Sequence, residues 1–331
     1  MKDFNYSVVI RTLGLAGEKY ARMLKAIDNQ TIKPKEILVV LAEGYNLPPE
    51  QLGYERYIFS KKGIVSQRSL GAIEAQADYC LFLDDDLDFE PTTVEKLYEP
   101  IRQGLADVTF PLLTEMLPQK GFGQIYTVLN ATAVPMLFHK KGSYTRILRS
   151  GGWSYNKQVD ETKTCYYQAE TAPGACYLVR KEHAVKIRFE EERWLEYASF
   201  SLPDDQINFY KYHKLGYKIY GVSNIKIDHL DGGGSSRERL LKAVYALAKH
   251  KVIFWHRFIY VNDESFLSRC LSLLCFVYWL FSSVLLGFIS SCIKMDFESY
   301  QTFFKGLNDG FKYIRTDEYK ALPIVTKKNY Y

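Results

Sequence analysis

Short apolar runs alternate with helical patterns along the first third of the chain. Four runs have the length and composition of strands buried on both faces, at residues 6–11, 36–41, 56–60 and 79–83. Between the first two runs, apolar residues recur at the spacing of an amphipathic helix, at Tyr20, Met23, Leu24 and Ile27. A further helix is expected directly before the fourth run. Because strand, helix and strand in this order form a βαβ unit, the pattern predicts an α/β fold with a mainly parallel sheet.

The fourth run leads directly into three carboxylates, Asp84, Asp85 and Asp86. Ligands of open α/β sheets bind beyond the carboxyl ends of the strands, and adjacent acids repel one another unless a cation or hydrogen-bond donors compensate. Mg²⁺ and Mn²⁺ bind carboxylate oxygens and often share their sites with phosphates. We therefore predict a metal-phosphate site here. The alternative is a solvated acidic turn that continues through Asp88 and Glu90.

Residues 112–173 show no clear periodicity and carry several glycines and tyrosines. A loop-rich segment of this length in a compact domain is commonly functional, so we interpret it as a substrate-facing insert. Trp153 within it either stacks on a sugar or lies in the core beneath a loop. Regular structure is expected again after the insert, with strands at residues 173–179, 217–222 and 225–229.

A helix between these strands is bracketed by Pro203 and Gly216. Asp204 and Asp205 begin its first turn, where they either complement the helix dipole or supply a general base. Mutual repulsion would raise the pKa of one carboxyl, whereas the helix N-terminus would lower it. His229 ends the last strand, before three glycines, and is either a metal ligand or a hydrogen-bonded histidine at a strand end.

The C-terminal part differs in character. Residues 270–293 are 24 consecutive residues without a charge, long enough to cross about 30 Å of hydrocarbon as a helix. Serines in this segment also fit a re-entrant hairpin or a helix lying in the membrane interface, and a buried helical hairpin is the remaining alternative. Residues 300–314 place an apolar stripe at helical spacing beside Lys305, Lys312 and Arg315, which suits an anionic lipid surface.

Composition limits the classes of protein to consider. With 331 residues, 47% hydrophobic and 24% charged, the chain can bury a full core. A net charge of +5 does not favour nucleic acid as a partner. The six cysteines form no C-x-x-C pair and no zinc spacing, and the first residues enter a strand without an apolar leader. We therefore expect the catalytic part to lie in the cytoplasm.

Several segments, in order, resemble glycosyltransferase family 2, the inverting enzymes of the GT-A fold. Residues 63–71 are similar to the G-x-x-x-A-R-N-x-G stretch of the family, with Arg68 in place, and Leu83–Asp86 matches its D-x-D motif. The resemblance implies a Rossmann-like, mixed but mainly parallel sheet flanked by helices, with a membrane-associated helical tail. The segments that carry it are residues 8–12, 30–40, 63–71, 83–86, 170–176, 204–205 and 304–310.

The resemblance also implies roles for single residues. Asp86 and His229 would hold Mn²⁺ or Mg²⁺, and Asp205 would be the catalytic base. Residues beyond the first two strands, in the following helix and in the acidic run would contact the nucleotide-sugar donor: Thr12, Glu43, Arg68, Asp84 and Asp85.

Some features leave alternatives open. Glu43 stands where the family usually has a pair of aspartates, so the nucleotide is not fixed, and Arg68 also fits a surface ion pair with Glu74 or Asp78. The Q-x-x-R-W motif of processive synthases is absent, which favours transfer of one sugar per event. A sugar-phosphate nucleotidyltransferase, with residues 11–17 as its triphosphate loop, and a non-catalytic membrane scaffold are the rival functions.

We expect three units: a nucleotide-sugar-binding half at residues 1–111, an acceptor-binding and catalytic half at 112–260, and a membrane-associated tail at 261–331. The predicted function is inverting, metal-dependent transfer of a single sugar, preferably from a UDP-sugar, to a saccharide or lipid-linked acceptor. The expected setting is cell-surface glycan biosynthesis at the cytoplasmic face of a membrane.

Overall fold

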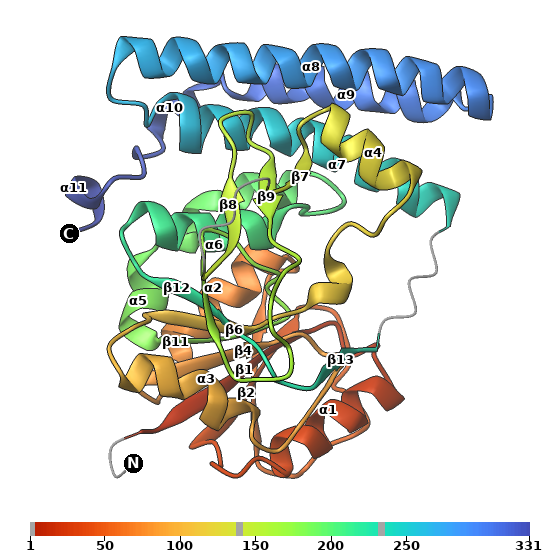
Figure 1. Ribbon diagram of the computed structural model, residues 1–331. Coiled ribbons are helices and arrows are strands. Elements are labelled where there is room, and N and C mark those ends of the chain that lie inside the picture. Colours follow the sequence, from red (N-terminus) through yellow and green to blue (C-terminus); the bar gives the residue numbers. More distant parts are fainter. Residues whose placement is uncertain (1–3, 137–141, 231–235) are drawn as a thin grey trace.

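The computed structural model describes residues 4–136, 142–230 and 236–331, and its centre is one mixed sheet (Figure 1). Eleven strands form this sheet, in the spatial order β3 (Glu55–Ser60), β2 (Glu36–Ala42), β1 (Tyr6–Thr12), β4 (Tyr79–Leu83), β11 (Cys176–Arg180), β6 (Val108–Pro111), β12 (Ile219–Val222), β10 (Tyr166–Ala169), β8 (Ser143–Ile147), β9 (Trp153–Tyr155) and β7 (Ala133–Pro135). The four strands β3, β2, β1 and β4 are parallel, and β11 runs antiparallel to both of its neighbours. The predicted α/β fold with a mainly parallel first half is confirmed.

Helices cover both faces of the sheet, which explains why its first strands are apolar throughout. On β1, Val8 and Ile10 face the helices α1 (Glu18–Asp28) and α3 (Thr93–Arg102), whereas Val9 faces the opposite core. Successive side chains of a strand point to opposite faces, so both must be apolar when both are covered. The second face is covered by α2 (Ile64–Glu74), α5 (Lys181–Lys186) and α6 (Asp204–Lys214).

The segment from residue 112 to 173 is more regular than its sequence indicates. Its described residues hold a 3₁₀ turn at Thr114–Met116, the helix α4 (Phe122–Leu129) and the strands β7 to β10. These strands have only three to five residues each, too few for an alternating pattern to stand out. The expectation of a mostly irregular insert is therefore wrong, and residues 137–141 lie outside the described part.

A small second sheet was not predicted. It pairs β5 (Leu87–Phe89), directly after the acidic run, with β13 (Ile227–His229) in antiparallel register. His229 is thereby opposite Leu87, the residue after Asp86. This pairing brings a histidine that is far away in sequence next to the carboxylates. The glycines that follow His229 lie outside the described residues.

The chain from residue 236 onward, called the tail below, is mostly helical and includes the expected tail at 261–331. It begins with α7 (Arg237–Trp255), which continues through a π-helical turn at His256–Tyr260, and α7 was not predicted. There follow α8 (Phe266–Lys294), α9 (Phe297–Tyr313), α10 (Asp317–Ala321) and α11 (Lys327–Tyr330), with α8 and α9 lying side by side in Figure 1. Among the described helices, α8 alone has the length and apolar composition to cross a membrane.

Two glycines allow α7 and α9 to pack closely. A Cβ atom on Gly306 would lie 2.5 Å from the carbonyl oxygen of Tyr245, and one on Gly310 would lie 2.7 Å from that of Lys249. Because no real Cβ approaches backbone oxygen so closely, any side chain at these positions would push the helices apart. The amphipathic stripe predicted at residues 300–314 therefore packs partly against α7, through Leu307 and Tyr313.

A buried ion network joins the tail to the sheet domain. Glu192, in the 3₁₀ segment η2 (Phe189–Tyr197), is fully buried and accepts hydrogen bonds from Arg257 at 2.8 and 2.9 Å and from Lys211 at 2.8 Å. Burial opposes ionisation of Glu192, but Arg257 and Lys211 outweigh it and lower the pKa of Glu192 to about 2. The hydroxyl of Tyr330 adds a hydrogen bond to Glu191. The last helix is thereby fixed to the domain.

Replacement of Arg257 with methionine should destabilise the protein strongly. It leaves the Glu192 carboxylate buried with one cation instead of two, and breaking a buried pair in this way costs about 3–5 kcal/mol. Urea denaturation measures the loss. Arg102→Met is the matched control, because Arg102 pairs with Glu99 on the exposed surface of α3 and should change little. Equal effects of the two substitutions would contradict a structural role for the network.

Candidate active site

The acidic run lies at the carboxyl end of β4 as predicted, and the pairing of β4 with β1 places it beside the end of β1. The Thr12 hydroxyl donates a hydrogen bond of 2.5 Å to Asp85 Oδ2, and Arg11 Nη2 lies 2.6 Å from Asp84 Oδ1. Because β1 and β4 are parallel neighbours, their ends bring these four side chains to one edge of the sheet. The solvated acidic turn is therefore not what the chain forms, since Asp84 and Asp85 are held by partners from β1.

Three side chains could together hold a metal ion. Ligand atoms of Asp84, Asp86 and His229 all lie within 4.8 Å of one another, and His229 Nε2 is 3.4 Å from Asp86 Oδ1. Two carboxylate oxygens and an imidazole nitrogen are a donor set that suits Mn²⁺. Asp86 and His229 are thus brought together as expected. Asp84, which we had assigned to the donor, joins them.

The electrostatics of the acidic run indicate a shortage of positive charge. Burial raises the pKa of Asp84 to about 6, against the opposing effect of Arg11, and nearby Asp205 and Asp86 raise it further. Burial also raises the pKa of Asp85, although the hydrogen bond from Thr12 opposes this shift. A bound cation would lower the pKa of both carboxyls, because it favours their ionised forms.

Arg68 is a buried residue of the site. Its side chain is 3% exposed, with Nη2 at 2.9 Å from Asp205 Oδ1 and Nη1 at 3.4 Å from Asp204 Oδ2. The alternative of a surface ion pair with Glu74 or Asp78 is wrong, because α2 turns Arg68 towards the N-terminus of α6. The charge of Arg68 also opposes the rise in the pKa of Asp84. Arg68 therefore acts on the carboxylates after β4 as well as on those of α6.

The two aspartates at the start of α6 differ in ionisation. Burial and the adjacent charge of Asp205 raise the pKa of Asp204, which favours its protonated form. For Asp205, burial is outweighed by Arg68, Arg11 and the backbone N–H of Gly174, and the pKa of Asp205 is lowered. A Cβ atom on Gly174 would lie 2.1 Å from Asp205 Oδ1, so glycine is required for this approach. Asp205 therefore favours its ionised form.

A cavity of about 420 Å³ opens beside the acidic run. Thr12, Asp85 and Asp86 line it, together with Gln67, which sequence reasoning did not single out. Gln67 Nε2 donates to the carbonyl oxygens of Thr12 and Val40 and so fixes the ends of β1 and β2. The available sequence signal for Gln67 was its position directly before Arg68, within the stretch 63–71 that resembles the family. The cavity has the size of a small-molecule site.

Not every predicted donor residue lines this cavity. Glu43 is exposed in the turn after β2 and does not appear in the cavity wall. Arg68 lines a separate small space, together with Asp84 and Gly174. The contacts of Glu43 and Arg68 with a donor stay predictions.

Comparison with known proteins gives one match to a family. The model of the family described as "Glycosyl transferase family 2" matches residues 7–187. A curated protein of Borreliella burgdorferi, "Cholesterol galactosyltransferase", is 32% identical over 113 residues, which cover 32% of this chain and 31% of that protein. The chain thus spans under a third of this relative's length.

Two solved structures are similar in fold. GalNAc-T7, solved with UDP, GalNAc and Mn²⁺, aligns with a TM-score of 0.48 at 16% identity, over 73% of this chain and 47% of that chain. S. aureus TarS 1–349, solved with UDP-GlcNAc, aligns with a TM-score of 0.48 at 12% identity, over 93% of this chain and 81% of that chain.

Removal of the Asp86 carboxylate should weaken metal binding. Asp86→Ala deletes one of the three grouped ligands, so the affinity for Mn²⁺ should fall at least about tenfold in calorimetric titration. Asp88→Ala is the control, because Asp88 pairs with Arg22 near the surface and is not among the grouped ligands. Unchanged Mn²⁺ affinity in Asp86→Ala would show that the cluster is not a metal site.

Proposed function

The chain belongs to glycosyl transferase family 2, and we propose that it transfers a single sugar, with inversion and metal dependence, from a nucleotide-sugar to a saccharide or lipid-linked acceptor. A UDP-sugar is the favoured donor, and cell-surface glycan assembly the favoured setting. One observation carries the proposal: the candidate metal ligands at the end of β4 and Asp205 at the start of α6 both lie near the buried Arg68. This arrangement suits a donor diphosphate at the metal ligands and an acceptor hydroxyl at Asp205.

On the donor side, the chain provides ligands and orientation. Asp84, Asp86 and His229 would hold the metal, which when bound stabilises negative charge on the leaving nucleoside diphosphate. Thr12 orients Asp85 through its hydrogen bond. Asp85 in turn can accept a hydrogen bond from a ribose hydroxyl of a donor in the adjoining cavity. We also assign residues 1–111 to donor binding and 112–260 to acceptor binding and catalysis.

On the acceptor side, Asp205 would take the proton of the attacking hydroxyl. A hydroxyl becomes more acidic as its oxygen bonds to the anomeric carbon, so an ionised carboxylate can remove the proton in the transition state. Arg68 holds Asp205 in place and keeps it ionised, and protonated Asp204 limits the repulsion between them. Because the chain belongs to glycosyl transferase family 2, the nucleotidyltransferase alternative is disfavoured. The grouped ligands Asp84, Asp86 and His229 disfavour a non-catalytic scaffold, which would have no need of them.

Asparagine substitution should affect kcat differently at the two aspartates of α6. Asp205→Asn removes the base and should lower kcat by about 10²–10⁴-fold with little change in the KM for the donor. Asp204→Asn resembles the protonated carboxyl already present and should cost far less. Transfer from a radiolabelled UDP-sugar to a lipid-linked saccharide measures both. Equal losses in the two variants would remove Asp205 from its assigned role.

The tail supports attachment to a membrane. The outer face of α8 is apolar, with Leu274 and Phe281 each 66% exposed, whereas its buried residues include Ser272 and Ser283. A soluble helix would turn its large apolar side chains inward, so this reversed pattern suits contact with lipid. Exposed basic residues on and after α9, such as Lys305, favour an anionic surface.

The packing of α8 favours the membrane interface over a spanning orientation. It lies along α9 and contacts the π-helical turn after α7, so one side is bound to the protein along its length. In the interface, only the outer face needs to enter the hydrocarbon. We propose that residues 261–331 hold the enzyme at the cytoplasmic face of a membrane in this way.

Charges on the outer face of α8 should release the protein from lipid. The double substitution Leu274→Glu and Phe281→Glu should lower partitioning into phosphatidylglycerol-containing vesicles more than about tenfold, because each apolar side chain contributes about 1.5–3 kcal/mol when buried. Vesicle flotation measures the bound fraction. Phe59→Glu, at an aromatic residue of β3 that is 55% exposed, is the control. Unchanged flotation of the double variant would contradict this mode of attachment.

A further inference from the structure

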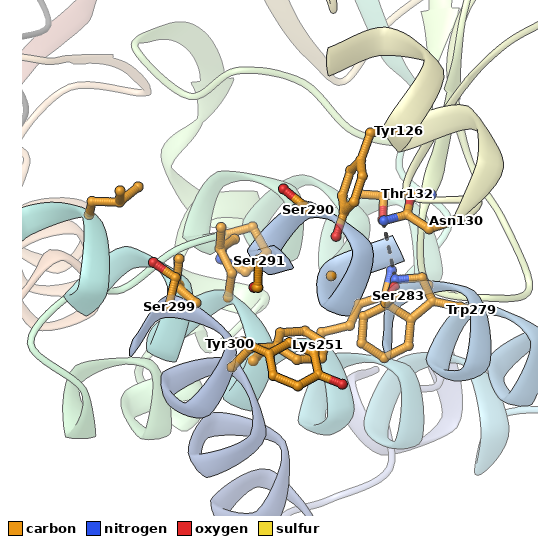
Figure 2. Close-up of a pocket in the computed structure, with 18 of the residues that line it drawn as sticks. Tyr126, Asn130, Thr132, Lys251, Trp279, Ser283, Ser290, Ser291, Ser299 and Tyr300 are labelled. Carbon is orange, nitrogen blue, oxygen red and sulfur yellow. Dashed lines mark hydrogen bonds between the residues drawn. The ribbon is translucent and has the colours of Figure 1, made fainter. Parts of the chain in front are cut away.

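A second and larger cavity, of about 530 Å³, lies under the tail and outside the site described above. Figure 2 shows residues around it that come from α4 and the strands after it, from α7, and from α8 and α9. Its walls are largely apolar, formed by Trp153, Val244, Leu247, Phe254, Trp279 and Phe303. A cavity of this size and lining suits the hydrocarbon part of a ligand.

The cavity contains donors that have no acceptor. Lys251 lies with Nζ 5.1 Å from the ring centre of Trp279 and pairs with no carboxylate in the described residues. The Ser283 hydroxyl is 3% exposed, and neither it nor Gln206 Nε2, which is also buried, has a hydrogen-bond partner there. Lys251 is only partly buried, but its ammonium has no counter-ion there, and the unpaired buried donors of Ser283 and Gln206 are costly. Together these groups call for an anion that is rich in acceptor oxygens.

Electrostatics at Lys251 agree with this requirement. Burial lowers the pKa of Lys251 to about 7, with no neighbouring carboxylate opposing the shift. An anion beside the ammonium would restore its usual charge. Lysine is a common phosphate-binding residue, acting as a compact point charge.

The apolar surroundings continue from the cavity to the outer surface. Tyr278 of α8 donates a hydrogen bond of 2.7 Å to the carbonyl of Leu129, so α8 and α4 are in contact. Each of these two helices also carries an exposed aromatic side chain: Phe122 on α4 is 93% exposed and Phe281 on α8 is 66% exposed. A chain that leaves the cavity between these helices would enter the same apolar surface that we assign to the membrane.

The cavity also borders the chain on either side of the two aspartates of α6. Pro203 and Gln206, which flank Asp204 and Asp205 in the chain, both line it. His250, the residue before Lys251, contacts the carbonyl of Leu202 through Nδ1 at 2.5 Å. The Lys251 segment of α7 therefore packs on the turn that leads into the two aspartates.

We propose that this cavity binds the lipid phosphate of the acceptor, with its phosphate oxygens at Lys251, Ser283 and Gln206 and its hydrocarbon leaving between α4 and α8. The assignment of this lipid as the acceptor rests on the proposed function. A sugar attached to the phosphate would extend past Pro203 to Asp205, where its hydroxyl would lose a proton. The acceptor class is thereby a phosphate-linked lipid, which a neutral glycolipid does not match.

Binding of an alkyl phosphate tests the proposal without any transfer reaction. Dodecyl phosphate, below its micelle concentration, is titrated calorimetrically into the full chain in a nonionic detergent. Lys251→Met should weaken binding at least about tenfold, the effect of losing one charge-assisted contact, and Lys251→Arg should restore part of it. Lys242→Met is the control, because Lys242 lies on the same helix, pairs with Glu238 and does not line the cavity.

Two comparison ligands, dodecanol and inorganic phosphate, test the lipid and the phosphate parts of the proposal separately. Weaker binding of both dodecanol and inorganic phosphate than of dodecyl phosphate supports a site for a lipid phosphate. Equal binding of dodecanol would overturn the phosphate assignment, and equal binding of inorganic phosphate would overturn the lipid assignment. Unchanged affinity in Lys251→Met would overturn the site itself. Mn²⁺ titration of the same samples separates these failures from a failure of the proposed function, because its ligands lie outside this cavity.

Discussion

Repulsion among carboxylates is the constraint on which the site depends. Five aspartates, three after β4 and two at the start of α6, gather at this edge of the sheet, where Arg11 pairs with Asp84 and Arg68 pairs with Asp204 and Asp205. The buried side chain of Arg68 thereby fixes α6 against the sheet edge. The raised pKa values of Asp84, Asp85 and Asp204 reflect burial and an imbalance of charge that these arginines only partly oppose. A divalent ion would reduce the imbalance on the side of β4.

The features visible in the sequence are those that local pattern determines. The first four strands, α1 and the acids after β4 follow from apolar runs and their spacing, and the structure has them where expected. The partner of Arg68 could not be found in this way, because Asp204 is 136 residues away and the contact depends on how α6 packs. The grouping of Asp84 with His229 could not be found from the sequence either, because His229 lies beside the acidic run only through the pairing of β13 with β5.

Other elements lack a clear signal for physical reasons. The strands of the segment from 112 to 173 are short and gain their stability from neighbours in the sheet. The first half of α7 is charged and largely exposed, whereas its second half is buried on nearly all sides, so no single periodicity runs through it. In α8, hydropathy indicated a helix, but only packing shows which face stays open to lipid.

Under the two proposals above, the tail would connect membrane attachment to the candidate active site. α7 packs on α9 through two glycines, carries Lys251 under α8 and contacts the turn before Asp204. The buried pair of Glu192 and Arg257 fixes this assembly to the sheet domain. Through these contacts a lipid held under α8 would be positioned relative to the candidate base, which joins the two proposals structurally.

The central claim is that the acids after β4 form a metal-dependent nucleotide site. Calorimetric titration of UDP, GDP and dTDP, each with and without Mn²⁺, tests it most directly. The account predicts that UDP binds, that binding requires Mn²⁺, and that the other two nucleotides bind more weakly. No binding of any nucleotide under either condition would contradict the assignment of Asp84, Asp85 and Asp86 to the donor site.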